Sequence, residues 1–274
     1  MRTIAVLNQK GGVGKTTTAV NVSAALAEAG KKVCILDLDP QAHASLHLGV
    51  QVPDSRQSVY EILTGEATFA DVRQQLSENL WLIPAHLDLA AAEVELAGEV
   101  GREVILRDKF VQDNAKFDYL IIDCPPSLGV LTINALTLVR EVFLPMQPHF
   151  LALHGLSKLL RTIEIVAKRL NKHLRLTGVL MCMYDTNTRL AAEVSTDVSD
   201  YFTGERGQDR MWSAAKTFET KIRRNIRLAE APSFGQTIFQ YAPQSHGAED
   251  YRLLAREVLG IPREATRDLP LAVA

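Results

Sequence analysis

Residues 9–18 decide the fold and read Gln9-Lys10-Gly11-Gly12-Val13-Gly14-Lys15-Thr16-Thr17-Thr18. In a phosphate-binding loop, glycines let backbone N–H groups approach phosphate oxygens, a lysine contacts the terminal phosphates, and a threonine hydroxyl binds Mg²⁺. Gly14, Lys15 and Thr16 supply the last part of such a loop. The strict P-loop spacing fails, because its first glycine would fall on Gln9. A second lysine, Lys10, stands in the loop instead.

The sequence on both sides supports a phosphate-binding loop. An apolar run at 3–7 is typical of a buried parallel strand, and the alanine-rich stretch 17–29 ends at Gly30, a residue type that often follows a helix. The order strand, glycine loop, helix is the context that the motif requires, and the helix dipole would favour a bound anion. The alternative is a chance glycine turn between a strand and a helix.

Strand and helix patterns alternate along the rest of the chain. We expect further strands at 32–37, 80–84, 119–123, 142–145 and 177–183, helices at 128–139, 151–170, 189–202 and 248–258, and mixed helical character at 87–111. This alternation predicts an α/β fold with a doubly wound, mostly parallel sheet and helices on both faces. We expect one P-loop ATPase domain over residues 1–260, a polar turn at 204–210 and a frayed tail at 261–274.

Composition narrows the classes of function. The 274 residues carry a net charge of −2, so any nucleic-acid binding would need a local basic patch. Cys34, Cys124 and Cys182 all lie in apolar runs, which indicates buried, reduced thiols. The chain shows no signal peptide and no apolar run of about 18 residues, and these observations predict a cytoplasmic protein.

Acidic residues end two of the expected strands. Asp37 and Asp39 precede Pro40, and side-chain alternation would point both acids the same way, at the sheet edge where open α/β folds bind ligands. One acid would orient an attacking water, and one would support Mg²⁺ through water. Asp123 closes an apolar strand, which is the Walker-B arrangement that holds Mg²⁺. The alternatives are a polar turn at 37–39 and an N-cap or turn role for Asp123.

Together these segments resemble the ParA/Soj group of partition ATPases, in the deviant Walker-A (signature-lysine) class. The resemblance covers the loop at 10–17, residues 37–41, residues 123–127 and residues 222–233, and so spans most of the chain. The loop alone fits the whole class, whereas Asp39-Pro40-Gln41 and Glu230-Ala231-Pro232-Ser233 single out the partition group. The first expected strand begins at residue 3, so the chain resembles the small form that lacks an N-terminal helix-turn-helix, and sequence-specific repression is not expected.

The resemblance implies a role for each matched residue. Lys10 matches the signature lysine, which reaches across a dimer to the partner's phosphates in the manner of an arginine finger in trans. Lys15 matches the P-loop lysine, Asp39 the hydrolytic switch aspartate, and Gly11 a glycine packed at the interface of the nucleotide-sandwich dimer. The implied nucleotide-binding residues are Gly11, Gly12, Val13, Gly14, Lys15, Thr16, Thr17, Met183 and Pro232, the last two beside the adenine. The implied metal ligands are Thr16, Asp37 and Asp123.

The resemblance also implies a cycle. ATP and Mg²⁺ would drive homodimerisation and binding to double-stranded DNA without sequence specificity, and a ParB-type centromere-binding partner would stimulate slow hydrolysis to ADP and phosphate. The protein would then be nucleoid-associated and act in chromosome or plasmid segregation. The chain departs from the family pattern at Ala42-His43, where Gly-Asn is common. This departure puts the flexibility of the switch loop in question, and His43 is either a pH-sensitive contact or a solvated turn residue.

A basic segment supplies the expected DNA contacts. Residues 216–227 hold five basic residues and one acid, a local charge of +4, which would bind phosphates with little base reading. Arg189, which opens an expected helix, matches another basic position linked to DNA in the family. The predicted DNA-binding residues are Arg189, Lys221, Arg223, Arg224 and Arg227. The alternative is an ordinary solvated face. The C-terminal sequence lacks a basic amphipathic helix, which disfavours a MinD-like membrane switch.

Three other functions stay open. The same ATPase could position a protein cargo such as chemotaxis clusters. A metabolic or electron-transfer enzyme of the superfamily, such as the nitrogenase iron protein, would need paired exposed cysteines for a cluster. A nucleotide-gated scaffold would bind ATP with negligible turnover. For Met183 and residues 231–232, plain core packing is the alternative to adenine binding.

Overall fold

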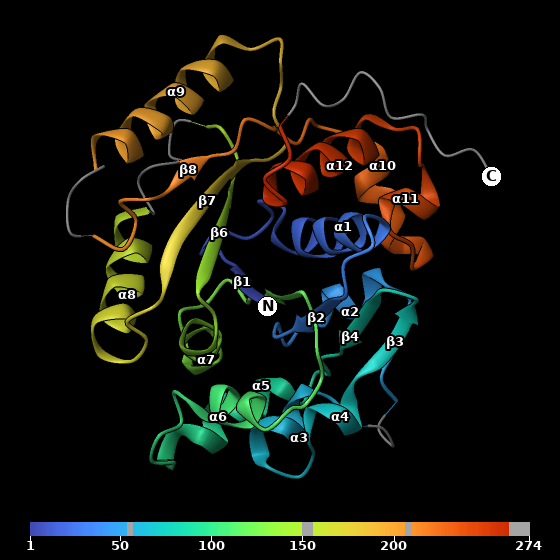
Figure 1. The fold of residues 1–274 in the computed structure, drawn as a ribbon, viewed down its shortest axis with the longest axis vertical. Coiled ribbons are helices and arrows are strands. Elements are labelled where there is room, and N and C mark those ends of the chain that lie inside the picture. The colour runs from blue at the N-terminus through green and yellow to red at the C-terminus, as the bar shows by residue number, and fades with distance from the viewer. Residues whose placement is uncertain (54–56, 150–155, 206–209, 263–274) are drawn as a thin grey trace.

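The computed structural model describes residues 1–53, 57–149, 156–205 and 210–262, and within them eight strands form one sheet in the order β3-β4-β2-β5-β1-β6-β7-β8 (Figure 1). All neighbouring strands are parallel except β3, which runs antiparallel to β4 at one edge. The predicted fold class is therefore confirmed. The strands are β1 (Arg2–Val6), β2 (Val33–Asp37), β3 (Gln74–Ser77), β4 (Leu80–Ile83), β5 (Tyr119–Asp123), β6 (Glu141–Met146), β7 (Arg175–Met181) and β8 (Lys216–Thr217).

Helices cover both faces of this sheet, because its central strands bury both of their faces (Figure 1). In β1, Ile4 and Val6 pack on one side with α1, α11 and α12, whereas Ala5 packs on the other side with α3 to α9. The helices are α1 (Lys15–Glu28), α2 (His43–His47), α3 (Val59–Thr64), α4 (Phe69–Val72), α5 (Leu89–Glu95), η1 (Leu96–Gly98), α6 (Ile105–Val111), α7 (Val130–Leu138), α8 (Leu156–Arg169), α9 (Arg189–Gly204), α10 (Ile226–Glu230), η2 (Ala231–Phe234), α11 (Ile238–Tyr241) and α12 (His246–Val258).

Most predicted elements are confirmed to within a few residues, and the exceptions have local causes. Gly30 follows α1 with φ 77°, and its N–H donates to the Ala27 carbonyl. The predicted strand at 177–183 is two residues too long at its end, because Met183 has a left-handed backbone with φ 51° and β7 stops at Met181. The region 87–111, for which mixed helical character was predicted, holds α5, η1 and α6.

Some expectations fall on residues outside the described ranges. The first part of the helix predicted at 151–170, most of the turn predicted at 204–210, and the tail from residue 263 onward are in this group. Among the described residues, no helix is both long enough and apolar enough to cross a lipid bilayer.

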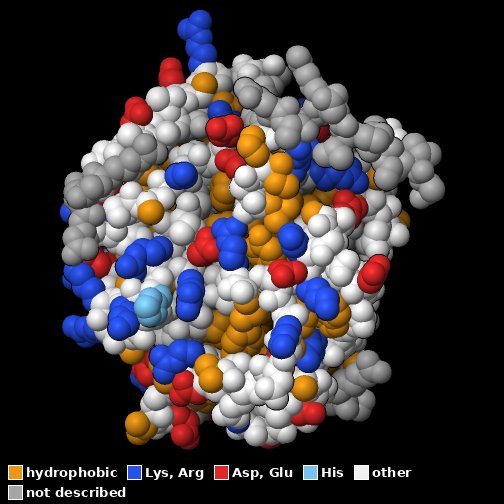
Figure 2. Space-filling model, in the orientation of Figure 1, with side chains coloured by type: hydrophobic (Ala, Val, Ile, Leu, Met, Phe, Trp, Pro, Cys, Tyr) orange, Lys and Arg blue, Asp and Glu red, His pale blue; other side chains and the backbone are white. Residues whose placement is uncertain are grey.

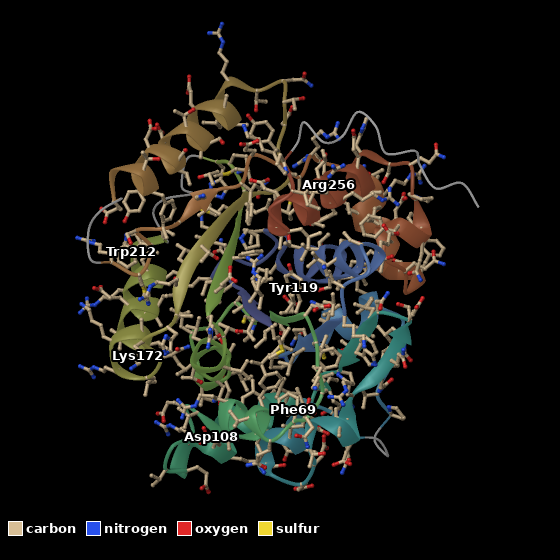
Figure 3. All side chains as sticks on the ribbon, viewed as in Figure 1. Phe69, Asp108, Tyr119, Lys172, Trp212 and Arg256 are labelled. Atoms are coloured by element: carbon tan, nitrogen blue, oxygen red, sulfur yellow. The ribbon has the colours of Figure 1, made fainter. Side chains whose placement is uncertain are left out.

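The two ends of the sheet differ in character. At the amino end, Tyr119 begins β5 near the centre of the view in Figure 3, and the Arg2 guanidinium lies 5.6 Å from its ring centroid. On the face drawn in Figure 2, Lys and Arg side chains are interspersed with Asp and Glu around a central band of hydrophobic side chains. At the carboxyl end, β1 runs into the glycine loop, and Asp37 and Asp123 end β2 and β5 in register. Open α/β sheets bind their ligands at this carboxyl end.

Candidate active site

The glycine loop between β1 and α1 has a backbone that only glycine adopts readily. Gly12 and Gly14 have φ values of 72° and 90°, and Gly14 is the N-cap of α1. The first N–H groups of this helix, which has 14 residues, are therefore presented at the loop, where an anion is favoured. Lys15 is 7% exposed and donates from Nζ to the Lys10 carbonyl oxygen at 3.2 Å, so its ammonium is folded back over the loop.

Thr16 and Asp123 form a site that fits a divalent cation. The Thr16 hydroxyl donates to Asp123 Oδ2 at 2.7 Å. Asp123 is fully buried, and its Oδ1 has no hydrogen-bond partner among the described residues. Because an unsatisfied buried carboxylate oxygen is costly, and hard cations prefer oxygen ligands, these two residues fit Mg²⁺. Mg²⁺ supplies neutralisation of phosphate charge when it is bound. The ligand roles of individual residues stay predictions.

Asp37 is organised differently from Asp123, although the two residues pair in register. Its Oδ2 accepts hydrogen bonds from the backbone N–H and the hydroxyl of Ser45 at 2.8 and 2.7 Å, and its Oδ1 accepts from the Asp39 N–H at 3.2 Å. The predicted metal role of Asp37 therefore fits indirect support better than direct ligation. The Ser45 hydroxyl also accepts from the Ala85 N–H at 3.1 Å, which links the segment to the end of β4.

Burial raises the pKa values of both acids. Burial raises the pKa of Asp37 to about 6, against the opposing effect of the hydrogen bonds from Ser45. Burial and the neighbouring charge of Asp37 raise the pKa of Asp123 well above its ordinary value. A cation beside these two carboxylates would stabilise their charged forms. The electrostatics therefore agree with the donor set at Asp123.

Asp39 lies at the start of the segment that leads into α2. It is 7% exposed, and its Oδ1 accepts from the Gln41 N–H at 3.0 Å. Ala42 has a left-handed backbone with φ 52°, which costs an alanine about 1 kcal/mol or more. A glycine, which the family resemblance led us to expect here, would adopt this backbone readily, so Ala42 stores strain close to Asp39. His43 is exposed, as the solvated-turn interpretation requires.

A cavity of about 390 Å³ lies beside the glycine loop. Gly14 and Thr17 of the loop and the first turn of α1 line it together with Cys182, Met183 and Tyr251. Met183, which was expected beside the adenine, is thus a lining residue of this cavity, and its contact with adenine stays a prediction. Pro232 is not among the lining residues, whereas residues 222–226, 228 and 229 are. The expected adenine contact of Pro232 stays a prediction.

Tyr251 is a lining residue that the sequence did not indicate. It comes from α12, near the C-terminal end of the chain, and is 1% exposed. Its hydroxyl is hydrogen-bonded to the Thr18 hydroxyl at 3.2 Å, and so joins α12 to α1 beneath the cavity. The three thiols are buried, as expected, and burial raises the pKa values of Cys34 and Cys182 to about 12.

The five residues predicted to bind DNA divide into two groups. Three are engaged within the chain: Arg223 contacts Asp250 at 2.6 Å and Glu249 at 2.5 Å, Arg227 contacts Glu230 at 2.8 Å, and the Lys221 ammonium lies 4.3 Å from the Tyr184 ring centroid. Arg189 and Arg224 are exposed, and within the described part of the chain their side chains form no hydrogen bond or ion pair. Arg224 also lines the cavity.

Comparison with known proteins finds similar sequences and similar solved structures. The family model described as an AAA domain matches residues 1–176. The sporulation initiation inhibitor protein Soj of Bacillus subtilis is 47% identical over 93% of this chain and 97% of its own length. The chromosome partitioning protein ParA of Caulobacter vibrioides is 42% identical over 96% of each chain. A solved structure titled cobyrinic acid a,c-diamide synthase of Mycobacterium smegmatis, with bound ATP analogue and magnesium, is 36% identical over 94% of each chain, with a TM-score of 0.80.

Proposed function

The chain belongs to the Soj/ParA family of chromosome-partitioning ATPases, and we propose that its ATP cycle gates non-specific binding to DNA. It is an ATPase whose cofactors are ATP and Mg²⁺. In the proposed cycle, ATP joins two subunits into a sandwich dimer, the dimer binds double-stranded DNA in the cytoplasm on the nucleoid, and a ParB-type partner stimulates hydrolysis and release. The cargo is a chromosome or plasmid.

One observation supports this proposal: Arg224 lies on a segment that lines the cavity beside the glycine loop, where we place the nucleotide. Its backbone N–H donates to the Tyr184 carbonyl oxygen, so the arginine is held beside Met183, while its side chain is exposed and unpaired among the described residues. A guanidinium so placed suits phosphate binding. Because the same segment would contact a nucleotide bound in the cavity, nucleotide binding would set the position of the arginine. This juxtaposition supports coupling between ATP and DNA.

The hydrolytic residues act by position and charge. Phosphoryl transfer needs little covalent chemistry from the protein, so catalysis consists of orienting the water and stabilising charge on the phosphates. Lys15 would hold the terminal phosphates within its own subunit, and Lys10 would add a second positive charge from the partner. Asp39 would orient the attacking water. Gly11, which has nothing within 4 Å of an added Cβ in this chain, leaves room for a partner at the interface.

The test compares nucleotide states in one set of assays. Purified protein is mixed with ATP or ADP, and its mass, its retention on double-stranded DNA of unrelated sequences, and phosphate release are measured with and without a ParB-type protein. The proposal expects a dimer and DNA retention with ATP only, and faster phosphate release with partner and DNA. Equal DNA retention in ATP and ADP would contradict it, and so would an absence of turnover, as a nucleotide-gated scaffold predicts.

A second candidate function is a metabolic synthase, because the 36% identical structure bears that title. It is distinguished by turnover that responds to a corrinoid acid and an amide donor rather than to DNA and a partner. An electron-transfer role is disfavoured, because all three thiols are buried. A protein cargo such as chemotaxis clusters uses the same cycle, and would differ only in the partner that stimulates release.

A further inference from the structure

We propose that His149 is a positioning residue for Lys10, which it holds against its own subunit before the dimer forms. The inference rests on the proposed function, in which Lys10 acts on the phosphates of a partner subunit. It adds a residue outside the glycine loop to that function, and it gives the monomer a contact that dimerisation must break.

The contact joins two side chains from neighbouring strand ends. Lys10 Nζ lies 3.3 Å from His149 Nε2. An ammonium group can only donate, so in this contact Lys10 is the donor and Nε2 is the accepting nitrogen of the imidazole. Lys10 follows β1, and His149 follows β6, which pairs with β1 in the sheet. Both residues are half-buried, so the hydrogen bond is partly protected from water.

The backbone around Lys10 is anchored separately from its side chain. Asn8 donates from Nδ2 to the Pro145 carbonyl oxygen at 2.7 Å, and its Oδ1 accepts the Lys10 N–H at 3.0 Å. On the other side, the Lys10 carbonyl oxygen accepts from Lys15 Nζ. These bonds can persist while the Lys10 side chain rotates. To reach a partner's phosphates, Lys10 would therefore keep its backbone position and give up His149.

This arrangement has a thermodynamic consequence. A contact present in the monomer and lost in the dimer weakens dimerisation by the contact's own contribution. A net hydrogen bond corresponds to roughly a fivefold change in an equilibrium constant, and a dimer breaks two copies, so the expected effect on the dimer dissociation constant is about 25-fold. His149 would thus raise the concentration of ATP-bound protein at which the dimer forms and Lys10 contacts the partner's phosphates.

The first experiment measures dimerisation by sedimentation with a slowly hydrolysed ATP analogue. His149→Leu removes the acceptor and should tighten the dimer by about 25-fold, whereas His149→Gln retains an acceptor oxygen and should stay within about threefold of the unmodified protein. Analogue affinity of the monomer should not change in either variant. An unchanged or weaker dimer in His149→Leu would overturn the proposal.

The second experiment is a double-mutant cycle in the ADP-bound monomer, which does not depend on dimer formation. Lys10→Met and His149→Leu are combined, and the unfolding constants are measured in denaturant. The proposal expects a coupling of about fivefold, and additive effects would overturn it. If Lys10→Met leaves ATP-dependent dimerisation and turnover intact, the proposed role of Lys10 fails, and this result is separate from the outcome of the cycle.

Discussion

Asp37 and Asp123 lie directly opposite each other in register on β2 and β5, and both are fully buried. Asp37 has its oxygens engaged by Ser45 and the Asp39 N–H, whereas Asp123 shares one oxygen with Thr16 and leaves the other unpartnered among the described residues. Asp37 thus holds the segment from Asp39 to Ser45 in place, and we call these hydrogen bonds the tether. Asp123, at the equivalent position of the adjacent strand, instead provides a site that suits a cation. Because Asp37 also lies next to Asp123, the position of Asp39 is linked to the strand ends beneath the predicted phosphate site.

Ser45→Ala tests the tether. The change removes a buried hydrogen bond to Asp37 and leaves the Ala85 N–H without its acceptor, so we expect the free energy of unfolding to fall by about 1–3 kcal/mol. ATP turnover should fall further than ATP affinity, because the loop carrying Asp39 loses its anchor. Ser23→Ala is the matched control, since Ser23 is buried but bonds only within α1. Equal losses in the two variants would contradict the tether.

Asp39→Ala tests the assignment of the hydrolytic acid. ATP affinity and ATP-dependent DNA retention should persist, because Asp39 contacts only the loop backbone in the described structure. Phosphate release should fall by roughly 100-fold or more, as removal of a positioned catalytic group does. The exposed Asp197 on α9 offers a control, and Asp197→Ala should release phosphate at the unmodified rate. Rapid turnover by Asp39→Ala would exclude the assignment.

The sequence predicted the phosphate-binding residues of the site better than it predicted the residues that line and support the site. The roles of Lys15, Thr16 and Asp123 were expected from local spacing, because a strand, a glycine loop and a strand-end acid need only short stretches of sequence. The anchor Ser45 and the lining residue Tyr251 were missed, because their importance depends on contacts made after distant segments pack. The only available signal for Ser45 was its place in the first turn after the switch motif.

The charge of the sequence segment alone did not indicate which basic residues form ion pairs within the chain. Within residues 216–227 the sequence offers five equivalent cations, yet Arg223 and Arg227 are paired with acids of α12 and α10. These acids are 3 to 27 residues away, so a local charge count cannot identify the pairs. The short strands β3 and β8 were missed for a similar reason, because each lies at an edge of the sheet and pairs with one neighbour, β4 or β7, rather than showing a periodicity of its own.

Arg224→Ala tests the DNA contact that the structure favours. Affinity for DNA should fall on every sequence, and the slope of log affinity against log salt should decrease by about 1 per subunit, as expected when one phosphate contact is lost. Arg189→Ala should behave in the same way. The exposed Arg169 at the end of α8 is the control, and Arg169→Ala should keep the unmodified slope. If Arg224→Ala also keeps that slope, the DNA contact lies elsewhere.

The buried His47 makes the metal-free protein sensitive to acid. His47 is 2% exposed at the end of α2, and burial lowers its pKa from 6.5 to about 4. Between these values the unfolded chain binds a proton that the folded chain excludes, so stability falls as pH falls, by about 2 kcal/mol between pH 7.5 and pH 5. Asp37, whose pKa is raised, acts in the opposite direction below about pH 6. The pH dependence of the free energy of unfolding of the unmodified protein therefore does not show the contribution of His47 by itself.

A comparison of variants isolates this contribution. The free energy of unfolding of the unmodified protein and of His47→Gln is measured with a chelator at pH 7.5 and pH 5. The variant should lose less stability on acidification, by about 2 kcal/mol, because glutamine does not titrate while Asp37 acts equally in both proteins. His43→Gln, which replaces an exposed histidine of the same helix, is the matched control for the substitution. Parallel profiles for His47→Gln and the unmodified protein would show that His47 takes up its proton equally in both states, in spite of its burial.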